Sequence, residues 1–188
     1  MGPTHEDIMS QKAYLKVEEA SREKHEYVAG RLFLMAGTTL AHNLIVNNLL
    51  VQLHGPVKRL GCRTFQEQVK LEMASLSAFY YPDLMVTCEK GPLDAVFITS
   101  PCLVAEVLSP STEIIDRREK LMAYRTIETL KEYLLISQKN RQIEVFRKNA
   151  DCEWDAVVYN GSESFLLSPG GRAEIELSLD DVYDQIEF

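Results

Sequence analysis

The sequence predicts an α/β protein in which a mixed central β-sheet is flanked by helices. Three observations lead to this class. Apolar residues recur at helical spacing over residues 40–60. The run Cys102–Ala105 is apolar at consecutive positions, which suits a central strand covered on both faces. Helical and strand patterns also alternate along the chain, and its 188 residues fit one domain, 1–188.

The first half of the chain predicts two helices separated by a hairpin. Ser10 is a suitable N-cap for a helix that ends near Ala20. Residues 26–35 read as two short strands joined at a glycine turn. The longest helix is expected to begin at Thr38 or Thr39.

The middle of the chain predicts strands and a loop. Pro56 is expected to end or kink the long helix. Strands are then expected at 64–73 and 80–88, followed by a loop over 89–100.

The second half predicts one helix among strands. A strand opens at Pro101, and Ser111 or Thr112 caps a helix through Ile127. The remaining expected elements are a hairpin of 132–137 and 143–147, strands at 154–159 and 172–177, and a short closing helix at 178–183.

Composition narrows the classes of protein that fit. The net charge of −8 and a pI of about 5.1 count against a nonspecific nucleic-acid binder, although basic residues gather locally near 117–125. No apolar run reaches the ~18 residues that a membrane span needs, and no signal peptide is recognisable. The four cysteines have no metal-ligand spacing, so we expect reduced thiols in a cytoplasmic protein.

Two carboxylates lie where strands are expected. Asp83 follows Pro82 at a strand start, where turn chemistry is the ordinary explanation. Glu106 lies inside an apolar run, where a charge rarely stays buried without a partner or a metal. The alternative for Glu106 is a strand-end position that points to solvent. Carboxylates on neighbouring strands could hold Mg²⁺, which prefers oxygen ligands.

Asp116 and Lys120 are four residues apart on the predicted helix and share a face. They could form a surface ion pair worth less than ~1 kcal/mol. Alternatively, Lys120 points toward the two carboxylates. With Lys120 in that role, Lys120→Ala is expected to leave folding largely intact, because a change from Lys to Ala in a helix costs little propensity.

The pair Pro82-Asp83 followed by Glu106-Val107 resembles the signature of the PD-(D/E)XK nucleases. That signature has Lys where this chain has Leu108. The run 106–112, followed by Asp116, Lys120 and Tyr124, is similar to a branch that carries its Lys on the next helix, the Uma-two family, or domain of unknown function 820. The resemblance extends from about His25 to Phe146. Its second departure is at 129–134, where the family often has Gly and Trp.

The resemblance implies a restriction-endonuclease-like core and a Mg²⁺-dependent DNA endonuclease, with Mn²⁺ as a substitute. Asp83, Glu106 and Lys120 would be catalytic. The metal would be held by Asp83, Glu106 and the carbonyl of Val107. The protein would act on DNA, without a membrane, as a homodimer.

The resemblance also adds less central positions. Glu26 corresponds to a glutamate near the first hairpin and would be a further metal or water ligand. His42 corresponds to a histidine that opens the long helix and would contact the site. Either residue could instead be structural. Tyr124, one turn past Lys120, is expected to pack in the core.

Two other functions remain open from the sequence. One is a nuclease fold that binds nucleic acid or protein without cutting. The other is a structural or oligomeric protein whose carboxylates lie in a polar cleft. Exposed hairpin edges, expected near Ile143 and Trp154, are a further reason to predict a homodimer.

Overall fold

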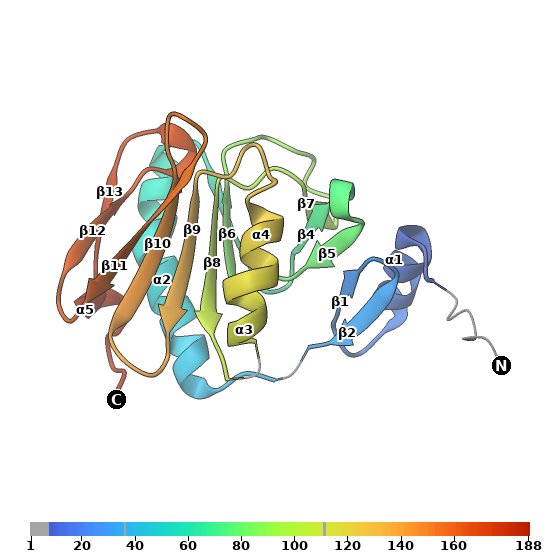
Figure 1. Cartoon of the computed structure of the whole chain (residues 1–188), viewed down its shortest axis with the longest axis horizontal. Coiled ribbons are helices and arrows are strands. Elements are labelled where there is room, and N and C mark those ends of the chain that lie inside the picture. Colours follow the sequence, from blue (N-terminus) through green and yellow to red (C-terminus); the bar gives the residue numbers. More distant parts are fainter. Residues whose placement is uncertain (1–7, 36, 111) are drawn as a thin grey trace.

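The centre of the molecule is a mixed six-stranded sheet, seen in Figure 1. The computed structural model describes residues 8–35, 37–110 and 112–188. The strand order is β11-β10-β9-β8-β6-β3, in which β8 and β9 are parallel and the other neighbours antiparallel. The strands are β3 (Arg63–Gln66), β6 (Leu84–Thr87), β8 (Leu103–Leu108), β9 (Glu132–Ser137), β10 (Gln142–Lys148) and β11 (Trp154–Asn160).

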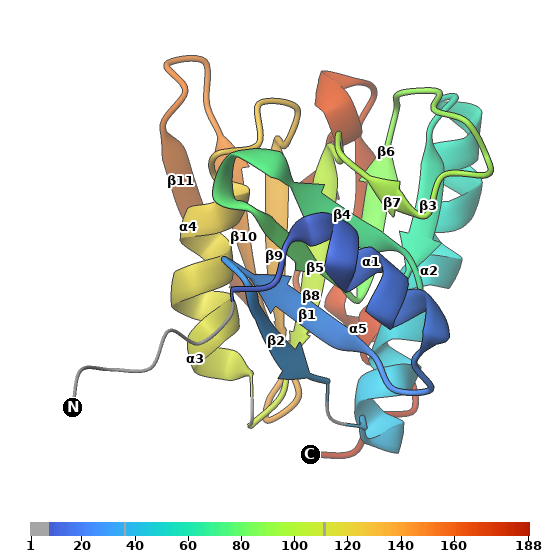
Figure 2. The ribbon, with the colours of Figure 1, turned by 90° about the vertical axis from the view of Figure 1, so that its right-hand side faces the viewer.

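A second, five-stranded sheet lies across part of the first, in the order β2-β1-β5-β4-β7. Figure 2 shows it together with α1 (Gln11–Ala20), between the helical segments on either side of the central sheet. Only residues 81–83 separate β5 from β6, so the chain crosses between the sheets just before Asp83. The strands are β1 (His25–Val28), β2 (Arg31–Leu34), β4 (Lys70–Met73), β5 (Ala78–Tyr80) and β7 (Phe97–Ile98).

Helices cover both faces of the central sheet. On one face, α2 (Leu40–Arg59) buries an apolar stripe that includes Ile45 and Leu49. On the other face lie α3 (Glu113–Ile115), a π-helical turn (Asp116–Lys120) and α4 (Leu121–Tyr124), which form one continuous helical segment. Each face therefore has its own apolar core.

The C-terminal part packs beside α2. The strands β12 (Ser164–Leu167) and β13 (Ile175–Ser178) form a two-stranded sheet, and α5 (Leu179–Val182) follows it. Ser178 caps α5 by accepting a hydrogen bond from the amide of Asp181. Short 3₁₀ turns occur at Ala74–Leu76 and Pro169–Gly171.

The mixed α/β class is confirmed, and so are the predicted N-caps Ser10 and Thr39, whereas Thr112 precedes α3 without a side-chain capping hydrogen bond. Ser10 and Thr39 each accept a hydrogen bond from an amide three residues on. Pro56, however, does not end α2, which continues to Arg59. Since the proline lies within a turn of the helix end, little of the hydrogen-bond ladder is lost. Ser111 lies outside the described residues.

Two predicted strands are wrong as single elements. Residues 64–73 divide into β3 and β4, and residues 80–88 divide into β5 and β6, with the halves in different sheets. A short turn interrupts each run, and the strands on its two sides pair with different partners. The hydrophobic alternation continues across the turn and therefore does not reveal this change. The predicted loop over 89–100 contains β7, and the strand expected at 172–177 begins only at Ile175.

Cys62 and Cys88 form a disulfide between the beginning of β3 and the end of β6. The antiparallel register places these two cysteines opposite each other. The prediction that all four cysteines are reduced is therefore wrong for this pair, while Cys102 and Cys152 are free thiols. Disulfides persist mainly in oxidising compartments, and the cytoplasmic location stays a prediction. No helix within the described residues is both long and apolar enough to cross a membrane.

Candidate active site

Glu106 lies on β8 of the central sheet, and Asp83 lies one residue before the neighbouring strand β6. Leu84 pairs with Ala105 in an antiparallel register. Asp83, which precedes Leu84, therefore lies beside Glu106, which follows Ala105. Glu106 lies two residues after Val104, so both side chains point to the same face of the strand. Val104 packs in the core beneath α4, and the side chain of Glu106 therefore points to that side. The Glu106 residue is only 3% exposed.

Lys120 brings three carboxylates together. Its Nζ lies 3.1 Å from each of Glu26 Oε1, Glu106 Oε1 and Asp116 Oδ1. Glu26 comes from β1, Glu106 from β8, and Asp116 from the same π-helical turn as Lys120. π-Helical turns are rare in proteins, and those that occur are often found at functional sites. The side chains of Lys120, Glu106 and Asp116 are almost fully buried, so the predicted alternative of a surface ion pair is wrong.

The charges of this cluster do not balance, because one ammonium faces three carboxyl groups. Burial opposes the charged form of Lys120, but Glu106, Glu26 and Asp116 outweigh it and raise the pKa of Lys120 well above its usual value. Burial raises the pKa of Glu106 well above its usual value, and Lys120 offsets this only in part because Asp116 and Asp83 act against it. The cluster therefore has an excess of negative charge that an added cation would neutralise.

Tyrosines enclose the cluster. Tyr124 donates a hydrogen bond of 2.9 Å to Glu106 Oε1, so this residue contacts the site and does more than pack. Tyr133 donates to the carbonyl of Asp116, and Lys120 Nζ lies 5.7 Å from the centre of the Tyr80 ring. Among the described residues, the two donors to Glu106 both contact Oε1.

Asp83 is more accessible than Glu106, with 17% of its side chain exposed. Its Oδ2 accepts a 2.7 Å hydrogen bond from the amide of Val107 and lies 3.1 Å from His42 Nε2. The amide of His42 donates to the hydroxyl of Thr39, the N-cap of α2, and this fixes His42 in the first turn of the helix beside Asp83. Burial lowers the pKa of His42, but Asp83, Glu67 and the Val107 carbonyl outweigh it and raise that pKa.

The structure brings all the predicted site residues into one region. They are Glu26, His42, Asp83, Glu106, Val107, Asp116 and Lys120. Glu67 was missed, although one of its carboxylate oxygens lies within 4.8 Å of the ligand atoms of His42 and Asp83. No motif or spacing marks it, because it lies in the turn that divides a run predicted as one strand.

Residues 12–180 match the model of the Uma2 family, described as "Putative restriction endonuclease". The match spans most of the chain and includes every residue of the site. The chain belongs to the Uma2 family. Two proteins of Synechocystis sp. are similar over nearly the whole chain. The uncharacterized protein slr1290 is 33% identical over 181 residues, which are 96% of this chain and 94% of that one. The uncharacterized protein sll1609 is 34% identical over 174 residues, 91% and 93% of the two chains.

A solved structure shares the fold of this Uma2 protein. It is a crystal structure, described as that of a putative nuclease belonging to DUF820, from Anabaena variabilis. The TM-score is 0.76 at 18% identity, and the alignment covers 95% of this chain and 99% of the other. The predicted family and the predicted restriction-endonuclease-like architecture are thus confirmed.

Proposed function

We propose that residues 1–188 form one domain that acts as a metal-dependent endonuclease and hydrolyses phosphodiester bonds in DNA. The observation that carries this proposal is that Asp83, directly before β6, lies beside Glu106 of β8, which contacts the buried ammonium of Lys120. The description of the Uma2 family and that of the Anabaena protein both support a nuclease-like reaction.

The donor set fits a divalent cation with a preference for oxygen. Asp83 and Glu106 contribute carboxylates, and the excess negative charge around Lys120 favours a cation at this place. The amide of Val107 holds Asp83 against β8, which fixes the direction of that carboxylate. A bound Mg²⁺ or Mn²⁺ would polarise a phosphoryl oxygen and lower the pKa of a bound water.

Lys120 would act as a cation and not as a base. The three carboxylates that surround it raise its pKa, so Nζ keeps its proton at neutral pH. A charged, buried donor can orient the attacking water and stabilise negative charge on the phosphate in the transition state. Glu26, from β1, and Asp116, from the π-helical turn, each contact the ammonium and hold it in position.

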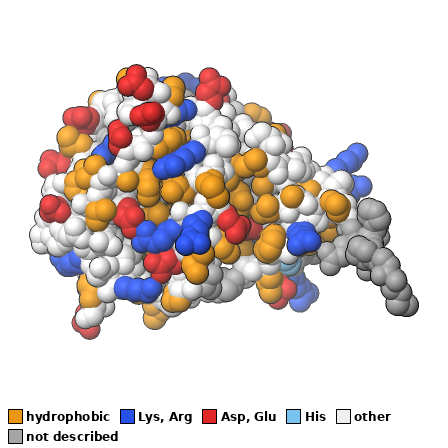
Figure 3. Space-filling view, in the orientation of Figure 1, with side chains coloured by type: hydrophobic (Ala, Val, Ile, Leu, Met, Phe, Trp, Pro, Cys, Tyr) orange, Lys and Arg blue, Asp and Glu red, His pale blue; other side chains and the backbone are white. Residues whose placement is uncertain are grey.

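DNA binding would depend on local charge, since the chain is acidic overall. In Figure 3, Lys and Arg side chains gather near the middle of the face that carries α3 and α4, interleaved with acidic ones. Two basic residues of this helical segment and the turn after it already interact with other side chains of the protein. Arg117 pairs with Glu113 and Glu144, and Arg125 lies over the rings of Phe146 and Trp154. We therefore expect weak nonspecific binding that falls with salt.

Asp83→Asn tests the metal and the reaction together. For the wild type we expect cleavage of plasmid, linear or single-stranded DNA with Mg²⁺ or Mn²⁺, and a rise in melting temperature when the metal is added. A ligand that binds only the folded state stabilises it by about 2.7 kcal/mol at a hundredfold excess over Kd. The variant should lose cleavage and most of the shift. DNA binding without cleavage by the wild type would favour the inactive binding module instead.

The proposal includes a homodimer that presents two sites to one DNA duplex. The edge strand β11 supports it, because Val157 and Val158 are 44% and 45% exposed on an open sheet edge. Ile143, expected near such an edge, is buried instead. Light scattering at assay concentrations should give twice the monomer mass of 21.4 kDa. A mass of one chain contradicts this part of the proposal.

A further inference from the structure

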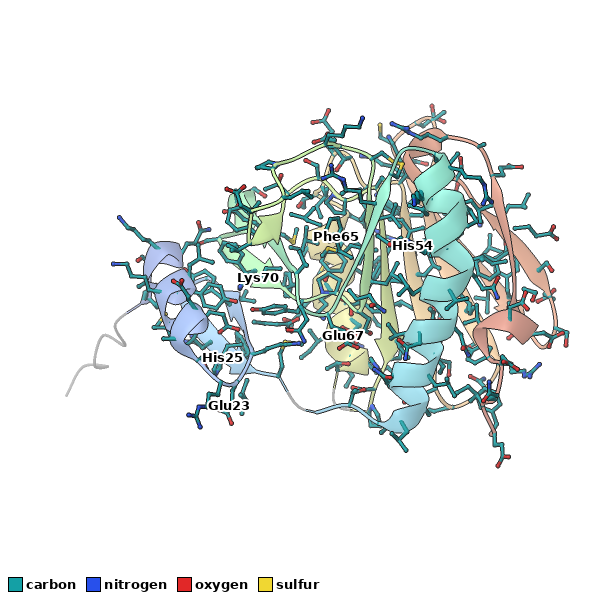
Figure 4. The ribbon with its side chains drawn as sticks, turned by 180° about the vertical axis from the view of Figure 1, so that it is seen from behind. Glu23, His25, His54, Phe65, Glu67 and Lys70 are labelled. Atoms are coloured by element: carbon teal, nitrogen blue, oxygen red, sulfur yellow. A yellow bond between two sulfur atoms is a disulfide. The ribbon has the colours of Figure 1, made fainter. Side chains whose placement is uncertain are left out.

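A second group of ligating side chains lies beside the proposed catalytic centre. His42, Glu67 and Asp83 each offer one ligand atom, and these three atoms all lie within 4.8 Å of one another. The residues come from three separate segments: the first turn of α2, the turn after β3 and the start of β6. Figure 4 shows Glu67 from the side of the molecule on which α2 runs.

The distance between His42 and Asp83 suits two adjacent ligands of one octahedral ion. Two ligands at right angles, each about 2.1 Å from an ion, lie about 3.0 Å apart, and opposite ligands lie about 4.2 Å apart. His42 Nε2 and Asp83 Oδ2 are 3.1 Å apart, close to the distance between adjacent ligands. The Glu67 oxygen lies within 4.8 Å of both atoms, so a side-chain movement of under about 1 Å would bring it within the distance between opposite ligands.

The backbone holds Glu67 in this place from two sides. Its amide donates to the carbonyl of Asp83, which ties the turn to the start of β6. Lys24, in the loop between α1 and β1, donates a hydrogen bond from Nζ to the carbonyl of Glu67. The Glu67 turn is therefore fixed next to Asp83 before any ion binds.

His42 has the surroundings of a metal-binding histidine. It is only 7% exposed, and Nδ1 has no hydrogen-bond partner among the residues that the structure describes. A buried, unpaired polar atom is costly. The carbonyl of Val107 lies near the ring. A ligating histidine directs one nitrogen to the metal and its other N–H to a carboxylate or backbone carbonyl, and binding through Nε2 would leave Nδ1–H for that carbonyl.

We propose that His42, Glu67 and Asp83 bind a second divalent cation, of the first-row transition-metal class represented by Mn²⁺. A site with one imidazole and two carboxylates suits such an ion better than Mg²⁺, which prefers oxygen ligands alone. This inference deepens the proposed function, since Asp83 would lie between both ions. Pairs of ions about 3.5–4 Å apart are common in phosphodiester hydrolysis.

The test is a Mn²⁺ titration of the metal-free protein, followed by electron paramagnetic resonance of free Mn²⁺. The wild type should bind two Mn²⁺ ions per chain. His42→Ala and Glu67→Gln should each bind one. The matched control His54→Ala, an exposed histidine of α2 that contacts Thr64, should still bind two. Circular dichroism checks that each variant is folded. Addition of Mg²⁺ should displace the ion that remains in His42→Ala more readily than the ion that His42 helps to hold.

The number of Mn²⁺ ions bound by each variant distinguishes a failure of this inference from a failure of the proposed function. Two ions in both His42→Ala and Glu67→Gln overturn the second site. A single ion in the wild type that is lost in Glu106→Gln and kept in His42→Ala overturns it as well. A single ion that is lost in His42→Ala and kept in Glu106→Gln supports the His42 site and contradicts the proposed ion at Glu106.

Discussion

Replacing Lys120 by methionine is expected to lower the free energy of unfolding by about 3–5 kcal/mol, because three carboxyl groups then lose the one ammonium between them. Methionine keeps much of the length of the side chain and removes its charge. The same change should reduce the rate of DNA cleavage by at least about 100-fold, the usual cost of removing a donor that stabilises transition-state charge. Urea denaturation measures the first effect. Single-turnover cleavage, at a temperature where the variant is folded, measures the second.

Two further variants separate the folding effect from the catalytic one. Lys58→Met removes a charge from an exposed position of α2, so stability and cleavage should both stay near the wild-type values. Lys120→Met combined with Glu106→Gln should recover part of the lost stability, because one uncompensated carboxyl group is gone, and should not recover cleavage. Wild-type cleavage by Lys120→Met at full folding contradicts the proposed role of this residue.

Replacing Glu106 by glutamine is expected to stabilise the metal-free protein at neutral pH while it removes cleavage. Burial raises the pKa of Glu106 above its usual 4.5, so between pH 4.5 and the folded-state pKa the folded protein keeps a proton that the unfolded chain releases. Wild-type stability from this group is therefore full below pH 4.5 and falls as the pH rises through the folded-state pKa. Glutamine does not titrate, and Tyr124 can still donate to its oxygen.

The measurement is the melting temperature of both proteins in EDTA from pH 4 to pH 8. The advantage of Glu106→Gln over the wild type should grow with pH, and a constant or shrinking difference contradicts the raised pKa. Cleavage should fall by more than about 100-fold, since losing an inner metal ligand exceeds the 10–100-fold cost of losing an outer one. Glu89→Gln, on an exposed loop, is the matched control and should change neither quantity.

Local signals in the sequence predict the helices better than the sheets. Ser10 and Thr39 mark helix starts because capping depends on residues only three positions apart. Strand partners depend on distant segments instead. The chain changes sheets at 67–69 and again at 81–83. Pro82-Asp83 is a local turn signal at the second break, but no local signal shows that the strands on its two sides belong to different sheets. The Cys62–Cys88 disulfide was missed for the same reason.

The site was predicted where a residue breaks the local pattern and missed where it does not. Glu106 stands out as a charge in an apolar run, and Lys120 through its resemblance to a family motif. Tyr124 looked like a core residue, because its phenol ring packs as one and only its hydroxyl reaches Glu106. Glu67 lies in a turn rich in polar residues, where one more carboxylate carries no signal.

The π-helical turn sets the angular phase of the whole segment from Asp116 to Tyr124. In a regular α-helix each step of four residues advances by about 40°, so two such steps would turn Tyr124 about 80° away from Asp116. A π-helical turn has more residues per turn, so the four residues from Asp116 to Lys120 fall short of a full turn. The α-helical step from Lys120 to Tyr124 exceeds a full turn, and the two deviations nearly cancel. Lys120 and Tyr124 can then both reach Glu106 Oε1, and Asp116 lies on the same side of the segment, where it contacts Lys120. This alignment makes the number of residues in the segment, and not only their identity, a requirement: a one-residue deletion within the turn would rotate the side chains that follow by about 100° away from their partners.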